Sequence, residues 1–128
     1  MASVSVPIFV ESRYKINRKR IKRTVEKVVD ANGVSGPVEV SIAIVGDRKM
    51  RDLSKKYKNE DKTRNILSFS LTEGEIMALP KDRLMLGDIV LSYPQVINDS
   101  VRDEVLVDDK VDELVEHGLL HLLGINHE

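Results

Sequence analysis

The sequence predicts an α/β fold of the α+β type: a single domain over residues 1–128, with helices packed on one mixed sheet of about four strands. Segments with strand-like and helix-like periodicity alternate along the chain. Apolar residues make up 41% and charged residues 32%, without a low-complexity tract. A length of 128 residues is enough for one hydrophobic core.

The first two predicted elements are a strand and a helix. Residues 3–10 alternate polar and apolar side chains, which predicts a strand, and Pro7 restricts that strand to an edge or a bulge. Asn17 is a suitable N-cap for a helix that continues to about Ala31 and stops at the following Asn-Gly pair. Its apolar residues recur at helical spacing and are expected to be buried: Ile21, Val25, Val28 and Val29.

A second strand and a second helix follow. Residues 38–45 (VEVSIAIV) are rich in β-branched side chains and alternate in polarity, which predicts a strand. Asp47 is then expected to cap a short helix that runs to about Tyr57, with Met50, Leu53 and Tyr57 facing inward.

The second half of the chain is predicted to hold two strands and a long final helix. That helix is expected to start near Val107 and Asp108, with acidic residues in its first turn, and to end at Gly124. The elements expected before it are a polar loop (58–65), a strand (66–71), a loop with Gly74 and Pro80, a strand (86–93) that ends at Pro94, and a short helix with a loop (94–105).

Composition excludes several classes of function. The chain has no cysteine, so it forms no disulfide and offers no thiolate nucleophile, and any metal must be held by nitrogen and oxygen atoms. No apolar run approaches the roughly 20 residues that a membrane span needs, and the N-terminus lacks the layout of a signal peptide. A cytoplasmic location is therefore expected.

Charge is distributed unevenly between the two halves. Residues 1–64 contain 16 Lys and Arg against 8 Asp and Glu, whereas residues 65–128 contain 4 against 13. A basic half can attract a phosphate-rich partner, because each neutralised phosphate releases counterions. The basic run RKRIKR can equally be the solvated face of an amphipathic helix, and both interpretations stay open.

All three histidines of the chain lie in its last twelve residues, HGLLHLLGINHE. His117 and His121 are four residues apart, so on a helix they project from one face, about 6 Å apart along the axis. Gly124 lets the chain reverse and bring His127 toward them. Three imidazoles with an open fourth position are typical of a catalytic zinc site. The alternative is two ordinary helix residues and a frayed terminus.

The spacing HxxxHxxGxxH is also that of the metzincin proteases. Those enzymes place a glutamate directly after the first histidine as the general base. Here that position is Gly118, and Glu116 points about 100° away on the other side of the first histidine. Peptide hydrolysis by that mechanism therefore lacks its proton acceptor.

Three runs resemble the YbeY family, the bacterial endoribonucleases and rRNA maturation factors. HGLLHLLGINH is similar to the family signature HGxLHLxGxDH, NILSFSL to NVLSFP, and LGDIVLS to the family's LGDI strand. The resemblance implies a single-strand-specific endoribonuclease that acts at the 3′ end of small-subunit rRNA and in ribosome quality control. It further implies one zinc ion on His117, His121 and His127, and rRNA and ribosomal components as partners.

This sequence departs from the family pattern at several positions. The family carries a tyrosine-arginine pair before its NVLSF strand, where this chain has Tyr57 and Lys58. Lys58 keeps the charge but cannot make a bidentate phosphate contact, and Arg64 is a second candidate for that role. Asn126 replaces an aspartate that could orient a ligand histidine, and Ser70 replaces a proline.

The expected mechanism is hydrolysis of a phosphodiester by zinc-activated water. Lys58 or Arg64 would stabilise the charge on the phosphate. The basic segments 13–27 and 48–64 would bind the RNA backbone. Ser68 and Asp88 are polar residues on otherwise apolar strands, and Asp88 could orient a histidine or a water. Two alternatives remain: a metallopeptidase with an atypical base, or a ribosome assembly factor with a structural metal. Nickel, copper or iron would also bind imidazole.

Overall fold

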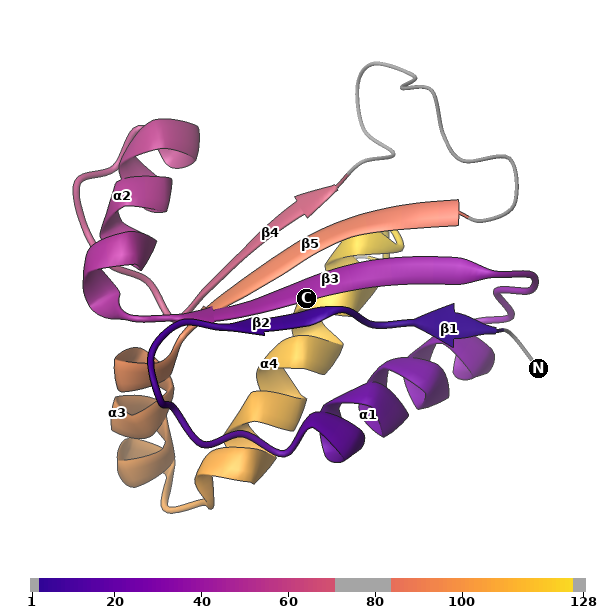
Figure 1. The fold of residues 1–128 in the computed structure, drawn as a ribbon, viewed down its shortest axis with the longest axis horizontal. Coiled ribbons are helices and arrows are strands. Elements are labelled where there is room, and N and C mark those ends of the chain that lie inside the picture. The colour runs from indigo at the N-terminus through magenta and orange to yellow at the C-terminus, as the bar shows by residue number, and fades with distance from the viewer. Residues whose placement is uncertain (1–2, 71–83, 126–128) are drawn as a thin grey trace.

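The computed structural model describes residues 3–70 and 84–125, which form one mixed sheet with helices on both faces (Figure 1). The described elements are, in order, β1 (Val4–Ser5), β2 (Ile8–Val10), α1 (Arg18–Ala31), β3 (Val38–Val45), α2 (Asp47–Lys58), β4 (Ile66–Ser70), β5 (Leu84–Ser92), α3 (Tyr93–Asp103) and α4 (Val107–Leu122). The predicted α+β class with one mixed sheet is confirmed. The loop expected around Gly74 and Pro80 lies outside the described residues.

The sheet has the order β1-β3-β5-β4, and β2 also pairs with β3. Strands β1, β2, β3 and β5 are parallel, whereas β4 is antiparallel to β5. The predicted first strand is therefore split into two short pieces at one edge of the sheet, with Pro7 between them. An edge position suits proline because it has no N–H to donate, while its carbonyl still accepts from the Ile42 N–H at 3.0 Å.

Helices α1 and α4 cover one face of the sheet and α2 packs against the other (Figure 1). The four apolar residues predicted for α1 are all buried, and its N-cap is Asn17, whose side chain accepts from the Arg20 N–H at 3.0 Å. The buried side chains of α4 complete the same core: Val111, Leu114, Val115, Leu119 and Leu122. Among the described residues, no helix is both long enough and apolar enough to cross a membrane.

Two predictions for α2 are wrong in detail. The N-cap is Gly46, and Asp47 is the first helical residue. Its carboxylate instead accepts hydrogen bonds from Thr63, Ser92 and Gln95, so it ties α2 to the start of α3 and to the loop before β4. Met50 is buried as predicted, but Tyr57 is 55% exposed and packs edge-on against Phe69.

A bulge interrupts β5 at Gly87. The register with β3 shifts there, since Glu39 pairs with Met85 and Val40 pairs with Gly87. Gly87 has φ +146°, and a Cβ at this position would lie 2.1 Å from the Phe69 carbonyl oxygen. Only glycine fits, because both the backbone angle and the approach of β4 exclude a side chain. The Gly-Asp pair therefore marks a bulge within a strand.

Candidate metal and RNA site

His117 and His121 lie on the exposed face of α4, one turn apart. The opposite face of the helix is buried against α1 and the sheet, so burial of the apolar residues fixes the rotation of α4 about its axis. The two histidines therefore share one face of α4, as their spacing predicts. Rotation of the helix that would turn them inward is opposed, because it would expose the buried apolar face.

Gly118 allows α4 to approach the sheet closely. A Cβ at Gly118 would lie 2.9 Å from Cδ1 of Ile66 and 3.4 Å from Cδ1 of Ile89. The position after the first histidine thus points at strands β4 and β5 and is buried. A protease-like glutamate cannot be accommodated there unless α4 or the Ile66 side chain shifts, which gives a steric reason for the glycine.

Ser68 holds one histidine from the neighbouring strand. Its Oγ lies 3.2 Å from Nδ1 of His121, and the two residues are 53 positions apart in the sequence. An imidazole engaged through Nδ1 has its Nε2 available as a ligand, and metal-binding histidines commonly use the second ring nitrogen in this way. The two described imidazoles are therefore of a ligand type that divalent transition metals bind.

The chain turns back directly after α4. Gly124 has φ +78°, its N–H donates to the His121 carbonyl at 3.0 Å, and the Ile125 N–H donates to the Leu120 carbonyl at 2.9 Å. This pair of bonds is a Schellman motif, which ends the helix and reverses the chain as predicted. His127 and Asn126 lie outside the described residues. Within residues 3–70 and 84–125, no group of three potential ligands forms a metal site, so the third ligand remains a prediction.

A hollow of about 500 Å³ opens beside His117, between α4 and the start of β4. Leucine and isoleucine side chains form its apolar part, and two carboxylates, an amide and an imidazole supply its polar groups. The lining residues are Asn65, Ile66, Glu113, Leu114, Glu116, His117 and Leu120. Asn65 and Glu113 were not singled out from the sequence. The only sequence signal for Asn65 is its place at the start of the NILSFSL run.

The structure separates the two candidate phosphate-binding cations. Lys58 is the last residue of α2 and is exposed, and Asn59 ends that helix in the left-handed conformation. Arg64 directly precedes Asn65 and is half-buried, with its guanidinium 3.5 Å from the Glu60 carboxylate. Neither side chain lines the hollow beside His117. Arg64 is the closer of the two along the chain to that hollow.

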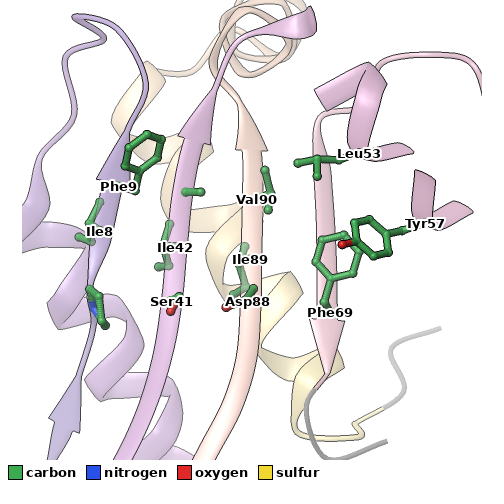
Figure 2. A pocket seen from close by; sticks show the side chains of 12 residues that line it. Ile8, Phe9, Ser41, Ile42, Leu53, Tyr57, Phe69, Asp88, Ile89 and Val90 are labelled. Carbon is green, nitrogen blue, oxygen red and sulfur yellow. The ribbon is translucent and has the colours of Figure 1, made fainter. Parts of the chain in front are cut away.

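Asp88 lies on the face of the sheet opposite to the histidines. Ser68 pairs with Ile89, and Phe69 pairs with Asp88. Since alternate residues of a strand point to opposite faces and Ser68 reaches His121, Asp88 points away from α4. It enters a groove of about 600 Å³, lined mostly by apolar and aromatic side chains (Figure 2). In the structure, Asp88 therefore does not orient either histidine of α4.

Part of the charge difference between the two halves of the chain is neutralised by ion pairs between helices α1 and α4. Arg20 of the basic helix α1 pairs with Asp109 and Asp112 of the acidic helix α4, each at 2.5 Å, and Thr24 donates to Asp112. Helix α2, which carries the second basic segment, packs on the opposite face of the sheet (Figure 1). The two basic segments therefore do not lie on one face of the sheet.

Known proteins resemble the chain over nearly its whole length. The family model described as "Endoribonuclease YbeY" matches residues 8–128. A protein named endoribonuclease YbeY from Syntrophus aciditrophicus is 36% identical over 92% of this chain and 72% of its own length. Its namesake from Syntrophotalea carbinolica is 34% identical over 94% and 81%. The solution structure of a Thermotoga maritima protein superposes with a TM-score of 0.62 at 22% identity, over 97% of this chain and 75% of that one.

Proposed function

Because the chain belongs to the endoribonuclease YbeY family, we propose that it is an endoribonuclease that hydrolyses phosphodiester bonds in single-stranded RNA. The substrate that the family resemblance implies is the 3′ end of small-subunit rRNA, with a second role in ribosome quality control in the cytoplasm. The pair of exposed histidines on α4, with His121 held by Ser68, is the observation that carries the proposal.

The proposed cofactor is one zinc ion on His117, His121 and His127. Zinc in such a site lowers the pKa of a bound water toward about 7 and polarises a phosphoryl oxygen. Ser68 lies against Nδ1 of His121, which would leave Nε2 of that ring for the ion, and the Gly124 turn ends α4 three residues before His127. Because the imidazole ligands are neutral, they would not cancel the positive charge of the zinc ion, and this charge would favour binding of an anionic phosphodiester.

Of the two cations, we favour Arg64 for contact with the substrate phosphate. It precedes Asn65, which lines the hollow beside His117, whereas Lys58 lies six residues earlier at the end of α2. The ion pair with Glu60 is half-exposed at 3.5 Å, so it is weak enough for the guanidinium to exchange it for a phosphate. A guanidinium also supplies the bidentate geometry that lysine lacks.

The proposal is tested with metal analysis and cleavage of single-stranded RNA by purified protein. We expect about one zinc ion per chain, and loss of cleavage in His117→Ala and on chelation. Arg64→Ala should lose about 100-fold in rate, the usual size for one group that stabilises transition-state charge, and Lys58→Ala should lose less. Asn98→Ala, an exposed change on α3, is the control. Cleavage that survives both chelation and His117→Ala contradicts the metal-dependent mechanism.

Two further measurements separate the alternatives. RNA binding should weaken steeply as salt rises from about 50 to 200 mM, because phosphate contacts release counterions, and a flat dependence counts against an RNA substrate. The metallopeptidase alternative is disfavoured because Gly118 is buried against Ile66 and Ile89. A fourth protein ligand on the metal would instead indicate a structural site in an assembly factor.

A further inference from the structure

The orientation of the Asn65 side chain is determined by a buried carboxylate. Nδ2 of Asn65 lies 2.9 Å from Oδ2 of Asp99, and Asp99 is only 8% exposed. An ionised carboxylate can only accept, so the amide must turn its NH₂ group toward Asp99. Arg102 lies 3.1 Å from the other oxygen of the same carboxylate. The amide therefore presents its oxygen, Oδ1, away from Asp99.

The backbone of Asn65 is fixed as well. Its carbonyl accepts from the Ser92 N–H at 3.0 Å, which attaches the residue to the end of β5. No described residue donates a hydrogen bond to Oδ1, although Asn65 lines the hollow beside His117. An oriented acceptor without a protein donor is available to a ligand in that hollow.

The hollow is rich in acceptors and poor in donors. Apart from His117, its polar residues are Glu113, Glu116 and Asn65, whose NH₂ group is already engaged by Asp99. Glu113 is paired with Lys110 at 3.1 Å, but Glu116 has no ion pair with the described residues. Such a wall repels a phosphate and favours a neutral group that carries O–H or N–H donors. Its apolar part, formed by Ile66, Leu114 and Leu120, suits the carbon skeleton of a sugar.

We propose that this hollow binds the ribose next to the scissile phosphate, and that Asn65 Oδ1 accepts a hydrogen bond from its 2′-hydroxyl. The inference rests on the proposed function, because it takes the phosphodiester to lie at the histidines. The 2′-hydroxyl is the sugar donor nearest to a phosphodiester in RNA, and DNA lacks it. Asn65 is thus a residue that distinguishes RNA from DNA, and Asp99 is the positioning residue that turns its acceptor toward the sugar.

The test measures binding by the zinc-loaded protein, recorded by stopped-flow fluorescence before cleavage proceeds. Wild-type protein is titrated with four labelled oligonucleotides of one sequence, carrying 2′-hydroxyl, 2′-amino, 2′-fluoro or 2′-deoxy sugars. The 2′-fluoro sugar keeps the pucker of RNA but cannot donate, whereas the 2′-amino group can. We expect the two donors to bind alike and the 2′-fluoro form to bind about fivefold more weakly, the size of one neutral hydrogen bond. Equal affinity for the hydroxyl and fluoro forms overturns the inference.

The same titrations on variants assign the effect to residues. Asn65→Ala should bind the 2′-fluoro form like the wild type but lose the roughly fivefold preference for 2′-hydroxyl. Asp99→Ala should lose most of that preference while keeping Asn65, and Asn98→Ala should keep all of it. A preference that persists in a folded Asn65→Ala overturns the role of Asn65.

Failure of the inference is distinguishable from failure of the proposed function. If the protein cleaves single-stranded RNA but shows no dependence on the 2′ substituent, the sugar site is refuted and the nuclease stands. If it neither binds nor cleaves RNA, the proposed function itself is refuted. Wild-type data alone decide the sugar preference, so the test remains decisive even where Asn65→Ala or Asp99→Ala does not fold.

Discussion

Gly118→Glu restores the glutamate that a metzincin protease would carry and is expected to destabilise the fold strongly. The Cβ alone would lie 2.9 Å from Cδ1 of Ile66, where ordinary contacts begin near 3.4 Å, so α4 or Ile66 must shift. Overpacking of this kind costs about 1 to 3 kcal/mol. Burying the glutamate carboxyl group against Ile66 and Ile89 without a hydrogen-bond partner would cost about 1 to 3 kcal/mol more. The total of about 4 kcal/mol is a large part of the stability of a small domain.

Gly118→Ala is the matched control for that variant. Its methyl group meets only the far end of a flexible isoleucine side chain, and alanine is favoured over glycine in a helix by about 1 kcal/mol. We therefore expect a change of no more than about 1 kcal/mol in either direction. Urea unfolding followed by circular dichroism gives both free energies of unfolding, and a peptide-library assay with zinc-loaded protein detects any peptidase activity.

Gly118→Glu should not unfold at the same urea concentration as the wild type. Unfolding at the same concentration would mean that position 118 is not packed against β4 and β5. A stable Gly118→Glu protein that gains peptidase activity would also revive the metallopeptidase alternative, because the glutamate would then reach the metal-bound water.

The other predictions concern the metal, the acid sensitivity and the bulge. Ser68→Ala should weaken zinc binding about tenfold, measured by competition with a chelator, because His121 loses its Nδ1 partner, and unchanged affinity would exclude this role for Ser68. Partial burial raises the pKa of Asp47, but hydrogen bonds from Ser92, Gln95 and Thr63 outweigh it and hold the pKa below its usual value. The stabilisation from the ionised Asp47 is present above about pH 4 and is lost as pH falls further. Urea unfolding at pH 7 and at pH 3 should therefore show that the free energy of unfolding falls more in the wild type than in Asp47→Asn. Equal decreases in the two proteins would contradict this role of Asp47. Gly87→Ala should lower the free energy of unfolding by about 3 kcal/mol or prevent folding, because its Cβ would lie 2.1 Å from the Phe69 carbonyl oxygen. An unfolding midpoint equal to that of the wild type would show that the bulge is absent.

Local sequence determined most of the secondary structure. The cap at Asn17, the spacing of the four apolar residues of α1 and the glycine that ends α4 act within a few residues, so their outcome can be predicted without the fold. The same holds for the shared face of His117 and His121, because helix geometry alone places side chains four residues apart together. Family membership also follows from short runs of residues.

Tertiary structure decided what surrounds those histidines. Nothing in the sequence shows that Gly118 faces Ile66 and Ile89, or that Ser68 reaches His121 while Asp88 points to the opposite face of the sheet. These facts depend on the register of β4 against β5 and on how closely α4 packs on them.

The orientation of Asn65 has the same origin, since its partner Asp99 lies 34 positions away on another helix. Periodicity reveals which face of an element is apolar, but contacts between distant segments depend on how those faces pack. The sequence alone therefore determined the element types, the histidine pair and the family, whereas packing decided which groups hold the histidines and what the neighbouring hollow can bind.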